Sequence, residues 1–366
     1  MRIKVGRLAI AAALFVMPVR TLLAAGSLTP PGAPAPTMHS LEEIYQALTN
    51  TLALAQANQL RLESLEKRLE SAGMSGEVQP VAGMSFIPAG AFEMGNCMTW
   101  RDNSGTNETP VHTVYVDAFY MDRGLVTKAL WDDVATWAAT NGYDITVSGG
   151  SGKFSMHPVQ EVSWYECVKW CNARSEKAGL PAVYRYLTSG MIFVPYRTGQ
   201  RDSLFKVSGG YRLPTEAEWE KAARGGLSGK RFPWGDSDTV QHARANYNAD
   251  STAETYDTSP TTGFHPDYDI LGEPYTSPER AFLPNGYGLY DMAGNVMQWC
   301  GDWYSDGYYS VSPGSNPMGP VGPLSARVAR GGSWFSSADE LRCASRRSWT
   351  PSQEIDYVGF RCARDY

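Results

Sequence analysis

The stretch Tyr211-Arg-Leu-Pro-Thr-Glu-Ala-Glu-Trp-Glu220, continued by Lys-Ala-Ala-Arg224, decides the fold. Thr215 and Glu218 have the spacing of a capping box. In this motif the hydroxyl accepts a hydrogen bond from the amide three residues on, and the carboxylate accepts one from the first amide. The stretch therefore predicts a helix that begins after Thr215 and ends near Arg224.

The segments around this helix predict a second helix, short strands and long loops. Ser163 and Glu166 repeat the capping-box spacing and predict a helix to about Lys177. The short runs 85–88 and 111–116 have a strand-like pattern. Long segments rich in Gly, Pro, Tyr and Trp fill the rest, and such loops usually need metal ions, disulfides or buried aromatic side chains to hold them.

Composition excludes several classes of protein. The 366 residues are 43% hydrophobic and 19% charged, which is typical of a globular chain and not of a disordered one. A net charge of -6 argues against a nucleic-acid partner, because nucleic-acid binders usually present a basic face.

The N-terminus indicates export. Arg2, Lys4 and Arg7 precede an apolar run over 8–19, and small residues end at Ala25, so we interpret residues 1–25 as a signal peptide for a periplasmic or secreted protein. The alternative is an uncleaved membrane anchor. The later sequence contains no apolar run long enough to cross a bilayer, so we expect no membrane span in the mature chain.

Two segments separate the signal peptide from the globular region. Residues 26–38 are a Pro-rich spacer. Over 39–73 the spacing predicts a coiled coil, because a seam spaced three and four apart runs from Leu41 to Leu69 and includes the polar Asn58. We expect the chain to self-associate through 41–69. The alternative is one amphipathic helix lying on the globular body.

The chemistry-bearing residues match no stand-alone catalytic motif. The five histidines form no HxxxH or HExxH pattern, and the sequence contains no GxSxG elbow or phosphate-binding loop. The run Gly331-Gly-Ser-Trp334 is typical of a turn between strands. Asn295 and Gln298 offer side-chain oxygens, which Ca²⁺ prefers, although a Gly-Asn pair is also an ordinary turn.

Taken together and in order, nine groups of residues resemble the formylglycine-generating enzyme family, whose domain is also called the sulfatase-modifying factor domain. They are 86–95, 108–112, 126–127 with 157–158, 162–164, 211–220, 232–235, 285–290 with 294–295, 330–334 and 359–361. The resemblance implies a sulfatase-modifying factor domain over 84–366, preceded here by the coiled-coil helix. It also implies an α/β (α+β), loop-rich fold like that of C-type lectins, with bound calcium.

This sequence departs from the family pattern at the two positions that carry the oxidase activity. Members that make formylglycine use two cysteines near the GGSW turn to bind copper and the substrate thiol. Ser336 and Leu341 occupy those positions here, and Cys343 is the nearest cysteine. Because thiolates select copper(I) and a hydroxyl does not, we expect no copper cofactor.

The resemblance also implies calcium ligands. One site corresponds to Asn295, Val296 and Gln298, where Gln298 replaces a family glutamate. The other corresponds to Asn246 and the carbonyl of Tyr247. Its remaining ligands lie within 257–269, where Asp257, Asp267 and Asp269 stay open alternatives.

The family's disulfide pattern transfers only in part. It implies a Cys171–Cys362 pair. The family's partner for Cys343 would fall at 222–223, which holds no cysteine, so we expect Cys300–Cys343. Cys97 and Cys167 then either pair or stay free.

Three functions remain open. The first is a non-catalytic binding or scaffold module, with a peptide or carbohydrate ligand on an aromatic surface. The aromatic candidates for it, which otherwise form core, are Trp303, Tyr304, Tyr308, Tyr309, Trp334, Phe335 and Trp349. The second is an oxidase that converts a sulfatase cysteine to formylglycine. The third is an enzyme of other chemistry that holds an anionic substrate in a pocket of Ser333, Trp334, Ser336, Arg346 and Arg347, for which we identify no base beside either serine.

Overall fold

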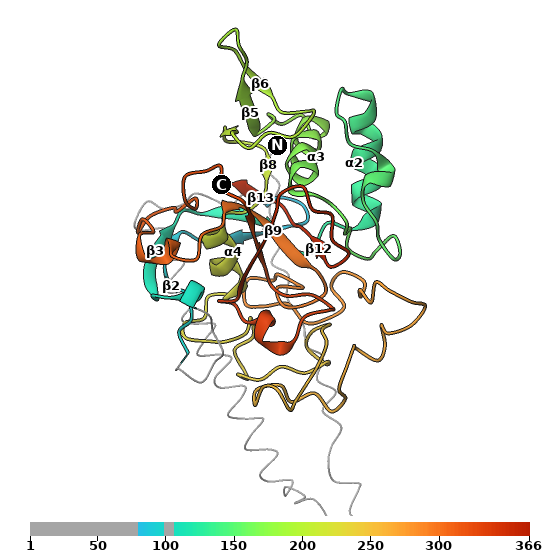
Figure 1. The fold of residues 1–366 in the computed structure, drawn as a ribbon, viewed down its shortest axis with the longest axis vertical. Coiled ribbons are helices and arrows are strands. Elements are labelled where there is room, and N and C mark those ends of the chain that lie inside the picture. Colours follow the sequence, from blue (N-terminus) through green and yellow to red (C-terminus); the bar gives the residue numbers. More distant parts are fainter. Residues whose placement is uncertain (1–79, 99–105) are drawn as a thin grey trace, which may run out of the picture. The chain divides into compact units, whose positions relative to one another are not determined.

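Two four-stranded sheets organise the chain in this computed structural model, which describes residues 80–98 and 106–366 (Figure 1). The first has the order β1-β4-β13-β8, with β1 Met84–Ile87, β4 Phe119–Asp122, β13 Ala363–Asp365 and β8 Tyr211–Arg212. The second has the order β11-β10-β9-β12, with β11 Arg346–Trp349, β10 Arg327–Arg330, β9 Met297–Trp303 and β12 Val358–Gly359. In the first sheet, β4 lies between β1, from the start of the described chain, and β13, from its end, and pairs with both.

Smaller elements complete the described structure. A hairpin joins β2 Gly90–Met94 to β3 His112–Val116, and a three-stranded sheet has the order β6-β5-β7, with β6 Phe193–Pro195, β5 Tyr184–Leu187 and β7 Phe205–Lys206. The helices are α2 Lys128–Thr140, α3 Trp164–Lys177 and α4 Glu216–Ala223, and 3₁₀ turns lie at Thr106–Glu108, Val147–Gly149, Tyr308–Ser310 and Ala338–Leu341. The mixed α/β character expected from the sequence is confirmed. The predicted signal peptide, spacer and coiled coil lie outside the described residues.

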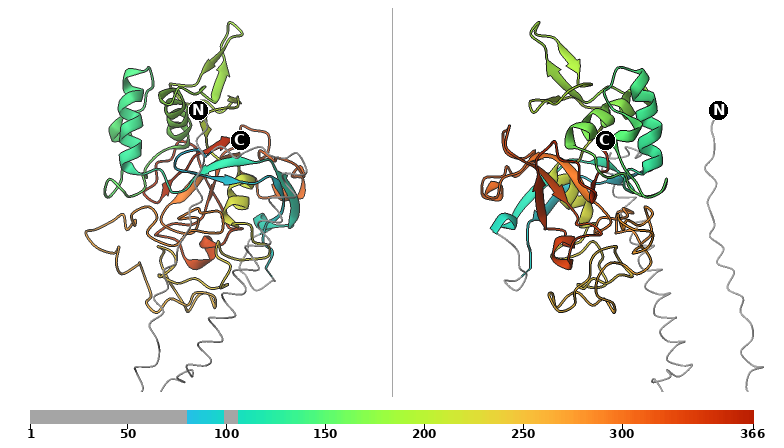
Figure 2. Two further views of the ribbon diagram at one scale, coloured as in Figure 1. Left: turned by 180° about the vertical axis from the view of Figure 1, so that it is seen from behind. Right: turned by 45° about the vertical axis from the view of Figure 1, so that its right-hand side comes forward.

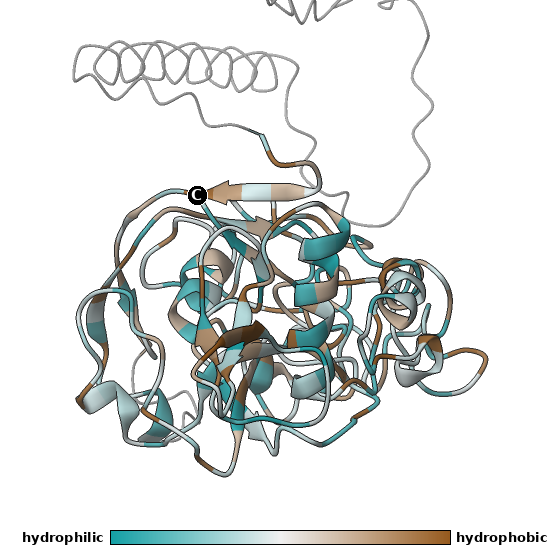
Figure 3. Cartoon of the chain, turned by 90° about the horizontal axis from the view of Figure 1, so that it is seen from above, coloured by the Kyte–Doolittle hydropathy of each residue, from teal (hydrophilic) through white to brown (hydrophobic). Residues whose placement is uncertain are grey.

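Both predicted capping boxes form. The Thr215 hydroxyl accepts from the Glu218 amide and the Glu218 carboxylate accepts from the Thr215 amide, and Ser163 and Glu166 do the same at α3. The two helices therefore begin where the sequence predicts. The helices drawn in Figure 3 carry both hydrophilic and hydrophobic residues. Every residue of α4 is buried, including its three glutamates.

The helix α2 is an element that the capping-box search misses. Thr127 caps it through the Leu130 amide, but position 130 carries no carboxylate to return the bond. Its buried side chains are Trp131, Val134, Ala135 and Ala138, a helical spacing that packs it against α3. The contact is aromatic, because Trp131 stacks on Trp170 with ring centroids 5.9 Å apart.

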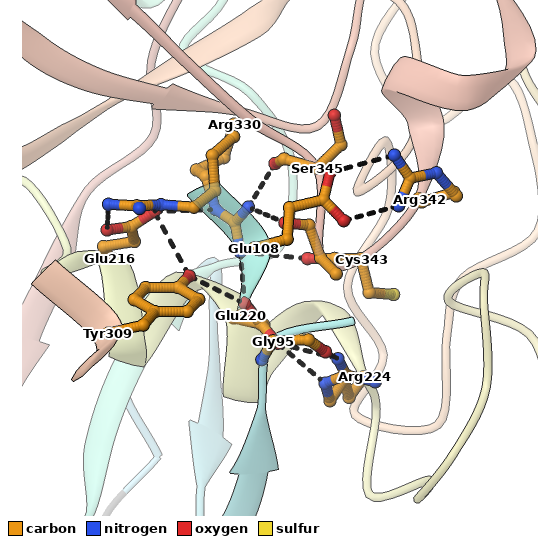
Figure 4. Close-up of polar contacts among 12 residues, drawn as sticks. Gly95, Glu108, Glu216, Glu220, Arg224, Tyr309, Arg330, Arg342, Cys343 and Ser345 are labelled. Carbon is orange, nitrogen blue, oxygen red and sulfur yellow. Dashed lines mark hydrogen bonds and ion pairs between the residues drawn. The ribbon is translucent and has the colours of Figure 1, made fainter. Parts of the chain in front are cut away.

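The helix α4 carries the buried charges that join the second sheet to the β2–β3 hairpin (Figure 4). One oxygen of Glu220 accepts from Arg224 at 2.7 Å and from the Gly95 amide at 2.8 Å. Its other oxygen pairs with Arg330, which also donates to the carbonyls of Cys343 and Ser345. Burial opposes ionisation of Glu220, but the two guanidinium groups outweigh it and lower the pKa of this carboxyl.

A second carboxylate of α4 extends the cluster. Glu216 accepts two hydrogen bonds from Arg346, at 2.6 and 2.8 Å. A separate buried pair joins Arg342 to Glu108 at 2.6 Å. These pairs connect segments that lie more than 100 residues apart in the sequence, so they fix the tertiary structure and not merely a local turn.

We expect Glu220→Ala to destabilise the fold strongly. The substitution leaves the buried Arg330 and Arg224 without their carboxylate, which should lower the free energy of unfolding by about 3–5 kcal/mol. Urea unfolding followed by tryptophan fluorescence measures the change. The matched control is Asp133→Ala, since Asp133 is an exposed partner of Lys177 and should leave the unfolding midpoint nearly unchanged. Equal effects of the two substitutions would contradict this account of the buried cluster.

Candidate functional site

The Gly331–Trp334 turn follows β10 and is held by close packing. Gly331 and Gly332 both have positive φ, at 94° and 67°. A side chain at Gly332 would meet Leu341 at 2.8 Å, and one at Gly331 would meet the ring of Trp219 at 2.9 Å. The turn is therefore confined between α4 and the 3₁₀ turn at Ala338–Leu341, with no room for larger residues.

The hydroxyls of this turn bond to one another. Ser336 Oγ lies 3.1 Å from Ser333 Oγ, accepts from the Ser333 amide and donates to Glu340. Ser333 and Ser336 are buried, as is Trp334, whose amide donates to the Asn295 carbonyl. The Glu340 carboxylate beside Ser336 is a group that the sequence did not indicate. Glu340 is also paired with Arg347. The Ser336–Glu340 hydrogen bond therefore stabilises the turn and occupies the Ser336 hydroxyl, which is not free to act as a nucleophile.

The positions that the resemblance assigns to copper-binding cysteines are filled by other groups. Ser336 has the bonds just described, and Leu341 is fully buried in an apolar cluster with Phe232 and Tyr247. Burial raises the pKa of the nearby Cys343 thiol to about 12, with Arg224 opposing and Glu220 adding to the effect. At neutral pH this stretch therefore presents no thiolate.

Arg346 is directed away from the turn. Its guanidinium binds Glu216 and donates to the carbonyls of Asn107 and Ser305, and among the described contacts it makes none with Ser333 or Ser336. It lines a cavity of about 280 Å³ with Asn107, Asp306, Arg342, Ser345 and Arg347, among others. The structure brings Ser333, Trp334 and Ser336 together and places Arg346 with the buried charges of α4.

The Asn246 site retains a free ligand atom. Asn246 Nδ2 donates to the Tyr275 carbonyl at 2.7 Å, while its Oδ1 is buried without a hydrogen-bond partner. The Tyr247 carbonyl lies 3.1 Å from His242 Nε2. Of the three acidic candidates, Asp257 is buried and accepts from the Tyr247 hydroxyl, whereas Asp267 and Asp269 are exposed.

The Asn295 site is arranged differently. Both lone pairs of the Gln298 side-chain oxygen are occupied, because Oε1 accepts a hydrogen bond from Trp219 and one from Arg361, each at 2.7 Å. Val296 is fully buried in apolar surroundings, and Asn295 exchanges two hydrogen bonds of 3.1 Å with the Ser277 backbone. Gln298 therefore does not fit as a calcium ligand.

Two oxygens near Asn295 have no partner, and the sequence analysis did not single them out. They are Ser277 Oγ and Asp291 Oδ1, both buried. Burial raises the pKa of the Asp291 carboxyl, while the Arg280 amide and the Arg361 guanidinium oppose this. Within the described residues, no group of three or more His, Cys, Asp or Glu side chains is arranged to hold a metal ion.

Of the three expected cysteine pairs, the structure brings the sulfur atoms of one close together. Cys171 Sγ of α3 faces Cys362 Sγ at 3.6 Å. Cys300 and Cys343 lie in one apolar cluster, and the structure gives no sulfur contact between them. Cys97 follows β2 beside Arg224, whereas Cys167 lies on α3 near Cys362, so the structure does not bring that pair together.

The aromatic residues of the loops are mostly core. Trp303, Tyr308, Tyr309 and Trp334 are buried, whereas Phe335 is 53% exposed. Phe335 stacks on Tyr357 at 5.6 Å and on Phe264 at 6.3 Å, and Trp349 contacts Tyr357 edge-on. Phe335 and the partly buried rings of Phe264, Trp349 and Tyr357 form what we call the aromatic patch.

Comparisons with known proteins identify the family of this chain. Residues 71–366 match the family model of the sulfatase-modifying factor enzyme 1-like domain. The chain belongs to the sulfatase-modifying factor family. It is 34% identical over 311 residues to the formylglycine-generating enzyme of Streptomyces coelicolor, which covers 80% of this chain and 92% of the relative.

Two further family comparisons bear on activity and fold. The inactive C-alpha-formylglycine-generating enzyme 2 of Bos taurus is 29% identical over 76% of this chain and 87% of its own length. The solved structure of Treponema denticola variable protein 1 superposes with a TM-score of 0.57 and 28% identity over 77% of this chain and 95% of that one. No helix among the described residues has the length and apolar character to cross a membrane.

We expect Cys343 to resist alkylation in the folded protein. Its burial and raised pKa keep it protonated at pH 8, so iodoacetamide should modify it only after unfolding. Peptide mass spectrometry before and after guanidinium treatment measures this. Cys97, which is only partly buried, is the internal control and should react in the folded state. Rapid labelling of folded Cys343 would show an accessible thiolate and contradict the prediction.

Proposed function

We propose that this chain is an exported, non-catalytic binding module on the sulfatase-modifying factor fold, multiplied by self-association through residues 41–69. The observation that carries the proposal is the closed turn at Ser333–Ser336. Its hydroxyls bond to each other and to Glu340, and the only thiol of the stretch 331–349 is the buried Cys343. The mixed α/β, loop-rich scaffold supports the proposal, because binding surfaces are often built on loops that a rigid scaffold positions.

The side chains of this turn are unsuited to copper oxidation of a thiol. Copper(I) is held by soft thiolates, and the two positions concerned carry a hydroxyl and an isobutyl group. Cys343 offers at most one sulfur, and that sulfur is protonated at neutral pH. A relative whose name states that it is inactive shows that family membership alone does not imply activity.

The aromatic patch is the surface we assign to ligand binding. Phe335 follows the turn directly and exposes its ring beside Tyr357 and Phe264. Stacked aromatic rings offer a large apolar area with fixed orientation, which suits a peptide side chain or a sugar ring. Repetition of this patch in a coiled-coil oligomer would raise the avidity of weak individual contacts.

The second candidate is formylglycine formation. The 34% identity to an enzyme of that name favours it, and the residues at 336 and 341 oppose it. The two functions differ in whether the chain converts the thiol of a substrate peptide, and a direct assay of turnover distinguishes them.

Calcium is the cofactor we propose. Asn246 fits the role because its buried Oδ1 is free to ligate, and Asp291 and Ser277 add two more free buried oxygens. A bound calcium ion would supply charge that offsets burial of the Asp291 carboxylate and would connect loops that contain little regular structure. Gln298 takes no part in this proposal, because protein donors already occupy its oxygen.

The decisive test of function is turnover. The purified chain with copper(I), oxygen and a peptide carrying the sulfatase CxPxR motif should give no conversion of thiol to aldehyde by mass spectrometry. An active family member run in parallel is the control. Aldehyde formation by this chain would reject the non-catalytic assignment.

The aromatic patch is tested separately with peptide and glycan arrays. The wild-type chain should retain ligands that Phe335→Ala loses, because the substitution removes the exposed ring and leaves the core intact. Val321→Ala, at another exposed apolar position, should bind as wild type does. Equal binding by Phe335→Ala would place the ligand elsewhere.

Calcium removal should lower thermal stability. We expect EGTA to reduce the unfolding midpoint by at least about 3 °C, with recovery on addition of CaCl₂ and not MgCl₂. Asn246→Ala should reduce this response, whereas Asp133→Ala, at an exposed position of α2 outside both calcium sites, should keep it. A midpoint indifferent to EGTA in the wild-type chain would contradict the calcium proposal.

A further inference from the structure

The three-stranded sheet β6-β5-β7 projects from the rest of the described chain as a narrow finger (Figures 1 and 2). We define the finger as residues 184–207. Leu187 pairs with Phe193 where the β5–β6 hairpin opens, and residues 188–192 form its tip. Gly190 and Met191 complete the turn, with Met191 at a φ of 60°.

The tip of the finger is apolar and exposed to solvent. Met191 is 76% exposed, Ile192 63% and Phe193 50%, although the three are consecutive. Phe193 packs edge-on against Phe205 of β7 at 4.9 Å, and Phe205 is itself 51% exposed. Exposed apolar residues scattered singly are ordinary, whereas adjacent ones such as these mark a site of contact with another apolar phase or surface.

The charge of the finger is opposite to that of the whole chain. Residues 184–207 contain three arginines, one lysine and one aspartate, a net charge of +3, whereas the chain carries -6. Among the described residues, neither Arg185 nor Arg201 forms an ion pair. Arg185 donates to the Ala182 carbonyl and Arg201 stacks on the Tyr186 ring at 3.8 Å. Two positive charges set back from the tip are thus available to an anionic partner.

The shape and chemistry together favour one kind of partner. A convex tip with several adjacent apolar side chains enters the boundary between headgroups and acyl chains, whereas a flat protein interface would need a complementary broad face. Arginines set back from the tip are placed to meet lipid phosphates, and an anionic surface attracts such basic residues. A second copy of this chain is also net negative, but it offers no dense layer of phosphates around an apolar interior, so a bilayer complements the finger better.

We propose that the finger docks this protein on an anionic lipid bilayer, with Met191, Ile192 and Phe193 inserted into the interface and Arg185 and Arg201 at the phosphates. This peripheral contact does not cross the membrane. It uses other residues than ligand binding at the aromatic patch, so an experiment can reject either proposal without rejecting the other.

The test places a reporter on the tip itself, because residues 8–19 are also apolar and could bind vesicles independently. The full chain in a Cys97→Ser background receives Met191→Cys labelled with the environment-sensitive dye NBD. Val321→Cys, 95% exposed in another loop, is the matched control. Each protein is mixed with phosphatidylcholine vesicles with or without phosphatidylglycerol.

With anionic vesicles, we expect the tip label to shift to the blue and brighten at least about twofold, while the label at 321 stays unchanged. With neutral vesicles or at high salt the binding should be at least about tenfold weaker. Arg201→Glu should weaken the response to anionic vesicles only. Phe193→Ser should weaken it for both, and unchanged thermal midpoints would show that both variants fold.

Three results would overturn the proposal. One is a tip label that stays in water while the protein floats with vesicles, which would assign binding to another segment. Another is no vesicle binding at all. The third is concentration-dependent self-association that shifts the tip label without vesicles and is lost in Phe193→Ser, which would make a second copy the partner.

Discussion

Glu220 is the carboxylate on which the rest of the packing depends. It is fully buried, and it receives Arg224 from the end of its own helix, Arg330 from β10 and the amide of Gly95 from the end of β2. In apolar surroundings an unpaired charge is very costly, so these groups are stable only when all are in place. The cluster therefore specifies which of many possible loop arrangements the chain adopts, which matters in a fold with so little regular structure.

Local signals in the sequence predicted the helices that carry complete capping boxes, and they failed where the signal was incomplete. The helices α3 and α4 begin at Ser163 and Thr215 as predicted, because each cap is decided within four residues. The helix α2 has a Thr127 cap without a returning carboxylate, so its evidence lay only in the spacing of buried residues. The role of Glu220 was beyond local reasoning, because Arg330 lies 110 residues away.

In the candidate site, too, some features could be predicted from the sequence and others depend on distant contacts. The resemblance located the turn, and the Asn246 oxygen expected to ligate calcium is free in the structure. Gln298, expected at the other calcium site, has its oxygen occupied by Trp219 and Arg361, which depends on three distant segments meeting. Asp291 and Ser277 were missed because an unpaired oxygen can be recognised only after every other hydrogen bond in its surroundings is known.

The Gly331–Trp334 motif is held by packing and hydrogen bonds that do not depend on the chemistry of the family. Gly331 and Gly332 are required by the approach of Trp219 and Leu341, and the Trp334 amide is bonded to Asn295. None of these contacts involves a thiol. The same packing tolerates Ser336, since its hydroxyl finds partners in Ser333 and Glu340. The motif that identifies the family is thus a requirement of packing. The oxidation chemistry that the resemblance implies requires two cysteines, and here Ser336 and the buried Leu341 fill those positions within the same packing.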